Sequence, residues 1–207
     1  MSWLSPLVSG DADCVWAPWL RSRHTGYKVE AADGEWAEWR AEHAPFLHAL
    51  ADERRSLGER TFLEGQDKFR LRVVEGAVID GKPDLVSAGA GEVPTVFDAK
   101  TGQPRDHHVA QVKLYMLLLP AAHPAYKGRT MAGCVAYKDG RRVQITPEEI
   151  TPEFRARVRC FVDQIIAATP PSKVPSAFEC RSCDISASVC PERQEWDTEL
   201  SEGDIPF

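Results

Sequence analysis

Two aspartates and a lysine lie in segments whose pattern is typical of β-strands. Asp84 is in GKPDLV, and Asp98 and Lys100 are in VFDAKTG. Because residues two apart in a strand point to the same side, we expect Asp98 and Lys100 to project together. Carboxylates on adjacent strands can hold Mg²⁺ or Mn²⁺, and a nearby lysine can orient or deprotonate a water and offset phosphate charge. This set predicts hydrolysis of a phosphodiester bond.

A lone D-x-K pattern would favour a simple surface ion pair instead, but further polar residues argue against that alternative. Gln111 and Tyr115 are four residues apart in a segment with a helical pattern, so they share one helix face. Buried glutamine and tyrosine side chains need polar partners. The two form either a satisfied core pair or part of a substrate site. A histidine of the preceding helix, His43 or His48, is a further candidate.

Three cysteines in CRSCDISASVC form a metal-ligand pattern; they are Cys180, Cys183 and Cys190. Soft thiolates favour Zn²⁺ or an iron–sulfur cluster. The last histidine of the chain is His123, so a fourth ligand must come from far away in the sequence. Cys14 is the natural candidate. Cys134, in an apolar strand, and Cys160, in an amphipathic helix, are expected to be buried packing residues.

The composition is that of an ordinary globular domain. The chain has 207 residues, of which 43% are hydrophobic and 27% charged, and its net charge is −6. This charge argues against non-specific coating of nucleic acid but leaves room for a local basic path. No apolar run approaches the roughly 18 residues that span a membrane, and the N-terminus has no signal-peptide pattern. We expect a cytoplasmic protein without a membrane partner, in which cysteines are thiols or metal ligands.

The elements that position these residues follow from apolar periodicity and turn signals. We expect helices over residues 36–57, 107–119 and 152–168, with a kink or break at Pro45 and a stop at Pro120. Strands are expected over residues 62–74, 77–87 and 95–100, followed by a hairpin of residues 131–137 and 142–145. The stretch before the last cysteines is expected to be a loop. This order predicts an α/β fold with a central sheet flanked by helices.

These motifs resemble the PD-(D/E)XK nuclease superfamily, specifically its RecB-like branch. The matching motifs, which agree in spacing and order, are Pro83-Asp84, Asp98-Ala99-Lys100 and Gln111-x-x-x-Tyr115. Position 98 holds aspartate rather than the commoner glutamate, and the family pattern allows either. The resemblance implies a restriction-endonuclease-like core with a central mixed sheet.

The resemblance also implies roles for individual residues. Asp84 and Asp98 would be metal ligands, Lys100 the catalytic lysine, and Gln111 and Tyr115 would support the active site or substrate binding. The motif histidine, a third metal ligand, maps best to His43, with His48 as the alternative. Glu64, on the first strand, is a further candidate.

One N-terminal and three C-terminal cysteines around such a core are similar to iron–sulfur RecB-type nucleases, which include a CRISPR-associated exonuclease family and the AddB nuclease domain. The resemblance implies a 4Fe–4S cluster that joins the termini, with Zn²⁺ as the alternative. Its ligands would be Cys14, Cys180, Cys183 and Cys190. Residues 1–207 would form a single nuclease domain, with cluster-binding segments at 1–35 and 170–195 and an acidic tail at 196–207.

We therefore expect a Mg²⁺- or Mn²⁺-dependent deoxyribonuclease, an exonuclease acting on single-stranded or end-processed DNA. The sequence has no P-loop signature, so ATP-driven unwinding would need a helicase or another complex subunit as a partner. One alternative is a non-catalytic iron–sulfur DNA-binding accessory subunit of a larger repair or defence complex. Another is a zinc-stabilised structural domain in which the D-x-K pattern is fortuitous.

Overall fold

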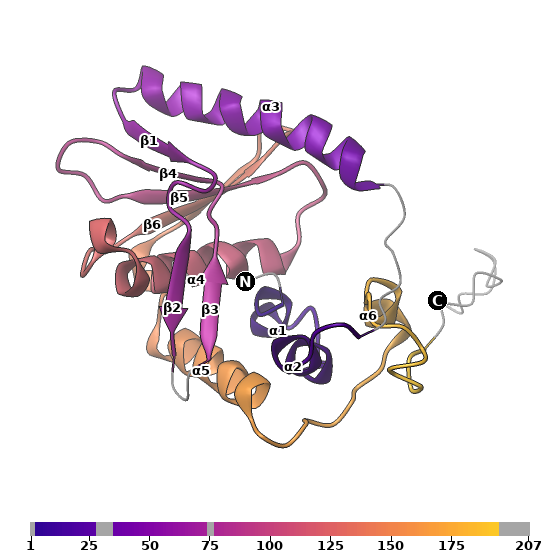
Figure 1. Cartoon of the computed structure of the whole chain (residues 1–207). Coiled ribbons are helices and arrows are strands. Elements are labelled where there is room, and N and C mark those ends of the chain that lie inside the picture. The colour runs from indigo at the N-terminus through magenta and orange to yellow at the C-terminus, as the bar shows by residue number, and fades with distance from the viewer. Residues whose placement is uncertain (1–2, 28–34, 74–76, 195–207) are drawn as a thin grey trace, which may run out of the picture. The chain divides into compact units, whose positions relative to one another are not determined.

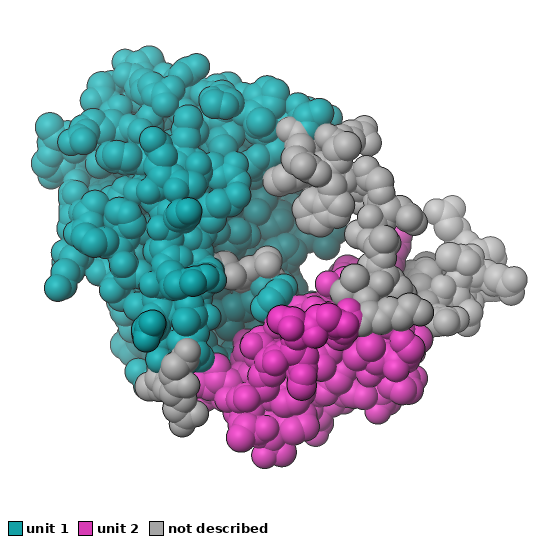
Figure 2. Space-filling model, in the orientation of Figure 1, with its two compact units in different colours: residues 1–11, 34–162 teal, residues 12–33, 163–207 magenta. Residues whose placement is uncertain are grey.

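The chain forms two compact units. The computed structural model describes residues 3–27, 35–73 and 77–194 (Figure 1). Residues 1–11 and 34–162 form one unit, which we call the core unit, and residues 12–33 and 163–207 form the other, the cysteine unit (Figure 2). Within the described part, no helix is both long enough and apolar enough to cross a membrane.

The core unit is built on a five-stranded mixed sheet. In spatial order its strands are β1 (Arg60–Leu63), β4 (Leu85–Ala88), β5 (Thr95–Lys100), β6 (Ala132–Tyr137) and β7 (Arg142–Ile145). Only β5 and β6 are parallel among these neighbours. A parallel pair needs a long crossover, and α4 (Asp106–Ala122) supplies it. The expected α/β architecture, with a mixed sheet between helices, is confirmed.

Helices α3 (Glu35–Ser56) and α4 cover opposite faces of this sheet (Figure 1). Leu50 of α3 belongs to the same apolar cluster as Phe97 of β5. Leu119 of α4 belongs to the cluster that holds Val96. Because side chains alternate along a strand, Asp98 lies on the same face as Val96, toward α4. The sheet register thus decides which helix the acidic motif faces.

Two of the expected strands are each divided in the structure. The segment over residues 62–74 becomes β1 and β2 (Phe69–Arg72), separated by a turn in which Gly65 has φ +88°. The segment over residues 77–87 becomes β3 (Val78–Gly81) and β4, with Pro83 between them. Proline has no amide hydrogen to donate to a ladder, which explains the second break. β2 and β3 pair antiparallel as a separate two-stranded sheet.

The two internal prolines do not break their helices. Helix α3 runs through Pro45, and α4 runs through Pro120 to Ala122. Proline in a helix costs about 3 kcal/mol, and burial of the apolar α4 residues that precede Pro120, including Leu118 and Leu119, offsets that cost. Helix α1 (Ser5–Ser9) packs against α4. The remaining core elements are the 3-10 turns η2 (Pro124–Tyr126) and η3 (Pro147–Glu149) and most of α5 (Pro152–Ile166).

The cysteine unit joins a segment near the N-terminus to the C-terminal segment. It contains α2 (Trp16–Arg23) and α6 (Ala177–Arg181), the latter within the expected loop. The Glu179 carboxylate accepts hydrogen bonds from the backbone amides of Asp13 and Cys14, at 3.0 and 3.1 Å. Trp19 Nε1 donates to the Ala167 carbonyl at 2.8 Å. Hydrogen bonds between residues far apart in the sequence, together with apolar packing, therefore hold these two segments to each other.

Gly133 of β6 provides a test of the packing between the sheet and α4. A Cβ atom at this position would lie 2.4 Å from Val112 Cγ1 and 2.7 Å from Met116 Sδ. We expect Gly133→Ala to lower the free energy of unfolding by about 1–3 kcal/mol, because β6 and α4 must move apart. Gly102→Ala is the matched control, since no atom lies within 4 Å of its added Cβ. Urea denaturation measures the free energy of unfolding of both variants. Equal values for Gly133→Ala and Gly102→Ala would contradict this packing.

Candidate active site

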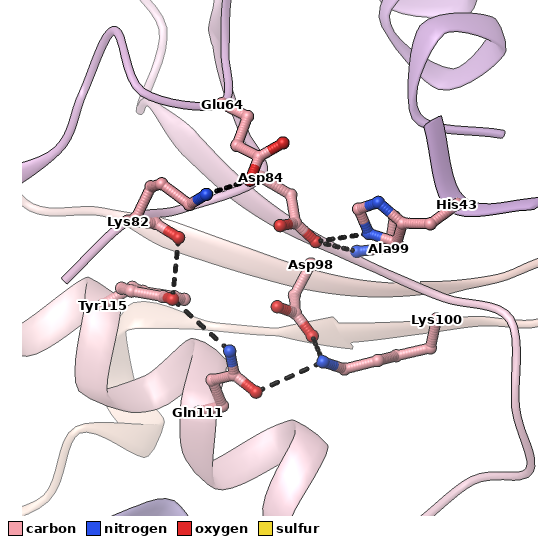
Figure 3. A network of polar contacts seen from close by, with 9 residues as sticks. All are labelled: His43, Glu64, Lys82, Asp84, Asp98, Ala99, Lys100, Gln111 and Tyr115. Carbon is pink, nitrogen blue, oxygen red and sulfur yellow. Dashed lines mark hydrogen bonds and ion pairs between the residues drawn. The ribbon is translucent and has the colours of Figure 1, made fainter. Parts of the chain in front are cut away.

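A network of polar contacts lies where the segment before β4 meets β5, α3 and α4 (Figure 3). All of its members belong to the core unit. They are His43, Glu64, Lys82, Asp84, Asp98, Ala99, Lys100, Gln111 and Tyr115. Every site residue expected from the acidic, lysine and helix motifs lies in this network.

Asp84 is held by a backbone amide and by the histidine of α3. Its Oδ2 accepts a hydrogen bond from the Ala99 amide at 2.8 Å and lies 3.4 Å from His43 Nε2. His43 is only 5% exposed, whereas His48 lies on the exposed side of the same helix. The hydrogen bond with Asp84 raises the pKa of His43, against the opposing effect of burial. His43 therefore gains a positive charge more readily here than in water.

Asp98 is a buried carboxylate with incomplete compensation. It is 1% exposed. Lys100 Nζ lies 2.7 Å from its Oδ2 as an ion pair, and no other group among the described residues donates a hydrogen bond to this buried oxygen. Burial, with the charge of Asp84 in addition, raises the pKa of Asp98 to about 6, and Lys100 opposes this rise. The site thus concentrates more negative charge than Lys100 alone neutralises.

A chain of hydrogen bonds orients Lys100. Its Nζ donates to Gln111 Oε1 at 3.2 Å, and Gln111 Nε2 donates to the Tyr115 hydroxyl at 3.3 Å. The Tyr115 hydroxyl in turn donates to the Lys82 carbonyl at 2.9 Å. An ammonium group has three protons. With Asp98 and Gln111 as its partners, the Lys100 ammonium retains one proton for a further ligand.

Two contributions to this network come from the backbone and carry no signal in the sequence. The amide of Ala99 binds Asp84, and the carbonyl of Lys82 binds Tyr115. The Lys82 side chain is ion-paired with Glu64, and the charge of Glu64 also helps to raise the pKa of His43. Every residue type except proline offers the same backbone N–H and C=O groups. Only the path of the chain shows which of them enter the site.

The donor set of the two aspartates fits a hard divalent cation. Asp98 Oδ2 is a buried oxygen whose one partner among the described residues is Lys100, and the charge of Asp84 acts on this carboxylate. Among the described residues, no group of three or more His, Cys, Asp or Glu side chains is placed to hold a metal ion. Mg²⁺ commonly takes one or two protein carboxylates and completes its coordination with waters and substrate phosphates. Asp84 and Asp98 would be the residues that hold it.

The four cysteines of the metal-ligand pattern all lie in the cysteine unit, and none is in a disulfide. Cys14, Cys183 and Cys190 pack against the same apolar cluster. Burial raises the pKa of Cys190, and the nearby thiols of Cys14 and Cys180 add to this rise. In the described part of the chain the four thiols do not form a ligand group.

The two remaining cysteines differ from each other. Cys134 is buried in β6, as expected. Burial raises the pKa of its thiol to about 11. Cys160 of α5 is exposed, so its expected role as a buried packing residue is wrong. In α5, Val158 is buried and faces the interior. A residue two positions further along a helix points about 200° away, which places Cys160 on the solvent side.

Tyr115 tests the orientation of Lys100. Tyr115→Phe removes the hydroxyl that joins Gln111 to the Lys82 carbonyl, and leaves the Gln111 amide and this carbonyl without that partner. We expect a loss of about 1–2 kcal/mol in the free energy of unfolding, with a drop in cleavage rate of about fivefold to tenfold because Gln111 is less well held. Single-turnover rates and urea denaturation measure the two effects. An unchanged cleavage rate would show that this series of hydrogen bonds does not orient Lys100.

A five-stranded mixed sheet between α3 and α4, with two aspartates and a lysine at the ends of β4 and β5, defines a protein of the restriction-endonuclease-like class. The family model of the PD-(D/E)XK nuclease superfamily matches residues 7–191. The chain belongs to this superfamily, and membership implies a metal-dependent nuclease. The crystal structure of SSO0001 resembles it with a TM-score of 0.47 at 20% sequence identity, over 92% of this chain and 85% of that one. No curated protein matches the chain.

Proposed function

We propose that this protein is a Mg²⁺- or Mn²⁺-dependent deoxyribonuclease that acts as an exonuclease on single-stranded or end-processed DNA. The observation that carries the proposal is the buried Asp98 carboxylate, which lies beside Asp84 and whose Oδ2 has Lys100 as its one partner among the described residues. A site of this kind has a high affinity for a divalent cation, since the cation supplies the missing positive charge. Family membership supports the nuclease class.

The residues divide the work of hydrolysis by their contacts. Asp84 and Asp98 would hold the metal, which when bound polarises a phosphoryl oxygen. His43 fixes the Asp84 carboxylate from α3. Lys100 is held by Asp98 and Gln111, and its remaining proton would contact the attacking water or a phosphate oxygen. Tyr115 and the Lys82 carbonyl keep Gln111 in place.

Cleavage of end-labelled DNA tests this proposal. Linear single-stranded DNA, circular single-stranded DNA, duplex DNA with overhangs and RNA are each incubated with Mg²⁺, Mn²⁺ or Ca²⁺. We expect Mg²⁺ and Mn²⁺ to support stepwise shortening of linear DNA while circles stay intact. Cutting of circles at the same rate would make the protein an endonuclease. DNA binding without turnover under any metal would favour the accessory-subunit alternative. Because the sequence lacks a P-loop, we propose that a helicase or another subunit supplies any unwinding.

We further propose that Cys14, Cys180, Cys183 and Cys190 bind a 4Fe–4S cluster, with Zn²⁺ as the alternative, and that it joins the terminal segments of one nuclease domain. Three observations support a shared metal. The cysteines come from distant parts of the sequence yet lie in one compact unit. All are free thiols. The Cys14 and Cys180 thiols are near enough to Cys190 to affect its pKa. Four thiolates are the number that such a cluster requires.

Metal analysis of protein purified without oxygen tests this second proposal. We expect a brown protein with about four irons and four sulfides per chain, and loss of the colour in Cys14→Ala. Cys160→Ala is the matched control, because Cys160 is exposed and lies outside the set. One zinc per chain would replace the iron–sulfur assignment by a zinc site. If the wild-type protein contained neither iron nor zinc, both the iron–sulfur and the zinc assignments would be contradicted.

A further inference from the structure

A histidine of α4 that the acidic site does not use lies on the same helix face as the residues that orient Lys100. His108 precedes Gln111 by three positions and Tyr115 by seven, so all three follow one stripe of the helix. The His108 side chain is buried, with 8% of the residue exposed. It is close enough to Lys100 for that charge to affect the His108 pKa. The stripe therefore continues past Gln111 for one more turn.

Tyr137 contacts one nitrogen of this imidazole. Tyr137 of β6 stands opposite Lys100 of β5 in the parallel register, and its hydroxyl lies 3.2 Å from His108 Nδ1. Burial raises the pKa of Tyr137, so the phenol keeps its proton and can donate it to Nδ1. A hydrogen bond from the Arg105 backbone partly opposes this rise in pKa. This is the effect expected of an amide that donates to the oxygen of the Tyr137 hydroxyl. With the hydroxyl as the donor to Nδ1, we assign the proton of His108 to Nε2.

The surroundings of His108 are predominantly cationic. The charges that lower its pKa are those of Lys100, His107 and Arg105, while Asp11 has the opposite effect. Asp11 is itself occupied, because its Oδ2 lies 2.7 Å from His107 Nδ1 and accepts the His107 amide at 3.1 Å. Burial is the main cause that lowers the pKa of His108, to about 3. The imidazole is thus neutral at physiological pH.

We propose that His108 contacts the substrate by donating a hydrogen bond from Nε2 to a non-bridging oxygen of a backbone phosphate beside the phosphate that is cleaved. Three features support this role. The assigned tautomer has its proton on Nε2, no described residue makes a polar contact with that nitrogen, and the neighbouring Lys100 and Arg105 attract an anion. A neutral donor adds a directional contact there without adding repulsion between cations. This inference rests on the proposed function, since it assigns part of the substrate path of that site.

The alternative is a purely structural pair, in which His108 only fills space against Tyr137. His108→Gln and His108→Met separate the two roles, because the two side chains have the same length and differ mainly in the amide. Glutamine keeps an N–H donor at the end of the side chain, and methionine does not. Loss of shape or of the Tyr137 contact would affect the two variants similarly. Loss of a phosphate contact would affect only methionine.

The experiment measures binding of a fluorescent single-stranded DNA oligonucleotide to the full-length protein in EDTA, with a thermal melt of each variant. We expect His108→Met to weaken binding about tenfold, the effect of roughly one charge-assisted hydrogen bond, and His108→Gln to stay within about twofold of wild type. A single methylphosphonate at the contacted phosphate should remove the difference between the two variants. Equal binding by Met and Gln, or no binding by wild type, would overturn the inference.

The outcomes for His108 and for the nuclease proposal are distinct. Suppose that the Gln and Met variants differ in DNA binding but that the wild-type protein fails to cleave DNA whichever divalent metal is added. The nuclease proposal then fails and the phosphate contact stands. If wild type cleaves DNA but the two variants bind alike, the inference about His108 fails alone. A kinetic readout supports the first measurement, since His108→Met should raise KM much more than it lowers kcat.

Discussion

Asp98→Asn is expected to reduce DNA cleavage about a thousandfold while leaving the fold intact. Asparagine keeps the shape of the side chain but removes the charge that would hold the metal. Metal-ion catalysis contributes several kcal/mol to the barrier, and each ~1.4 kcal/mol is a factor of ten in rate. Single-turnover cleavage with Mn²⁺ and with Mg²⁺ measures the loss. A residual rate above about a tenth of wild type would exclude Asp98 as a metal ligand.

The same substitution has an expected effect on stability of the metal-free protein. Burial raises the pKa of Asp98 to about 6 in the folded state, above its usual value of about 4. The folded state therefore binds this proton more tightly than the unfolded state does, and stability falls as the pH rises from about 4 through 6. In EDTA, Asp98→Asn should lack this fall and be at least as stable as wild type at pH 7. Urea denaturation at several pH values measures it.

Asp80→Asn is the matched control for both effects. Asp80 is an exposed carboxylate on β3 that pairs with Arg70 at 2.8 Å. Exposed ion pairs contribute little, so this variant should keep wild-type cleavage and nearly wild-type stability. If Asp80→Asn and Asp98→Asn changed cleavage equally, the loss would reflect a general effect of lower negative charge rather than a metal site.

Lys100→Met is expected to lower the cleavage rate by about 10²–10⁴, the range typical of a lost proton-transfer group. The methionine fills much of the same space but cannot contact water or phosphate through a proton. Lys113→Met is the matched control, because Lys113 lies on α4 and pairs with Glu149 outside the acidic network. Rates over a range of Mn²⁺ concentrations distinguish the roles, since a lysine that acts in catalysis leaves the metal requirement largely unchanged. A wild-type rate for Lys100→Met would contradict any catalytic role.

Lys100→Met should also destabilise the metal-free protein, since it leaves the Asp98 carboxylate buried without its ion pair. Breaking a buried pair by removal of one partner costs about 3–5 kcal/mol, less where the carboxyl takes up a proton. The double variant Asp98→Asn/Lys100→Met should recover stability but not cleavage. This pattern would separate the structural from the chemical role of Lys100. Failure of the double variant to recover stability would show that the ion pair is not the source of the loss.

Several parts of the site follow from local periodicity. A strand repeats every two residues, so Asp98 and Lys100 had to share a face wherever β5 lay. A helix repeats every 3.6 residues, so Gln111 and Tyr115 had to share a stripe of α4. Both relations hold for any tertiary arrangement. The sheet order did not follow in this way. The expected strands over residues 62–74 and 77–87 each divide into two, because turns at Gly65 and Pro83 interrupt otherwise strand-like patterns.

The choice between the two histidines of α3 shows where local patterns end. His43 and His48 lie on one helix of mixed polarity, and the sequence left both open. In the structure His43 is buried beside Asp84 and His48 is exposed. The face of α3 that meets the sheet is decided by the packing of Leu47 and Leu50 against β5 and its neighbours. This packing is a property of the whole core unit rather than of the helix.

The sequence by itself determined the chemical groups of this protein and their local spacing: two aspartates and a lysine on strands, a Gln–Tyr pair on a helix, and cysteines near both ends. Only the tertiary structure decided their environment. The Ala99 amide and Lys82 carbonyl entered the site because of the chain path. The high pKa of Asp98 arose because β5 is the central strand of the sheet and packs against α4. Residue type and spacing are local properties, whereas burial and charge–charge distances depend on segments far apart in the chain.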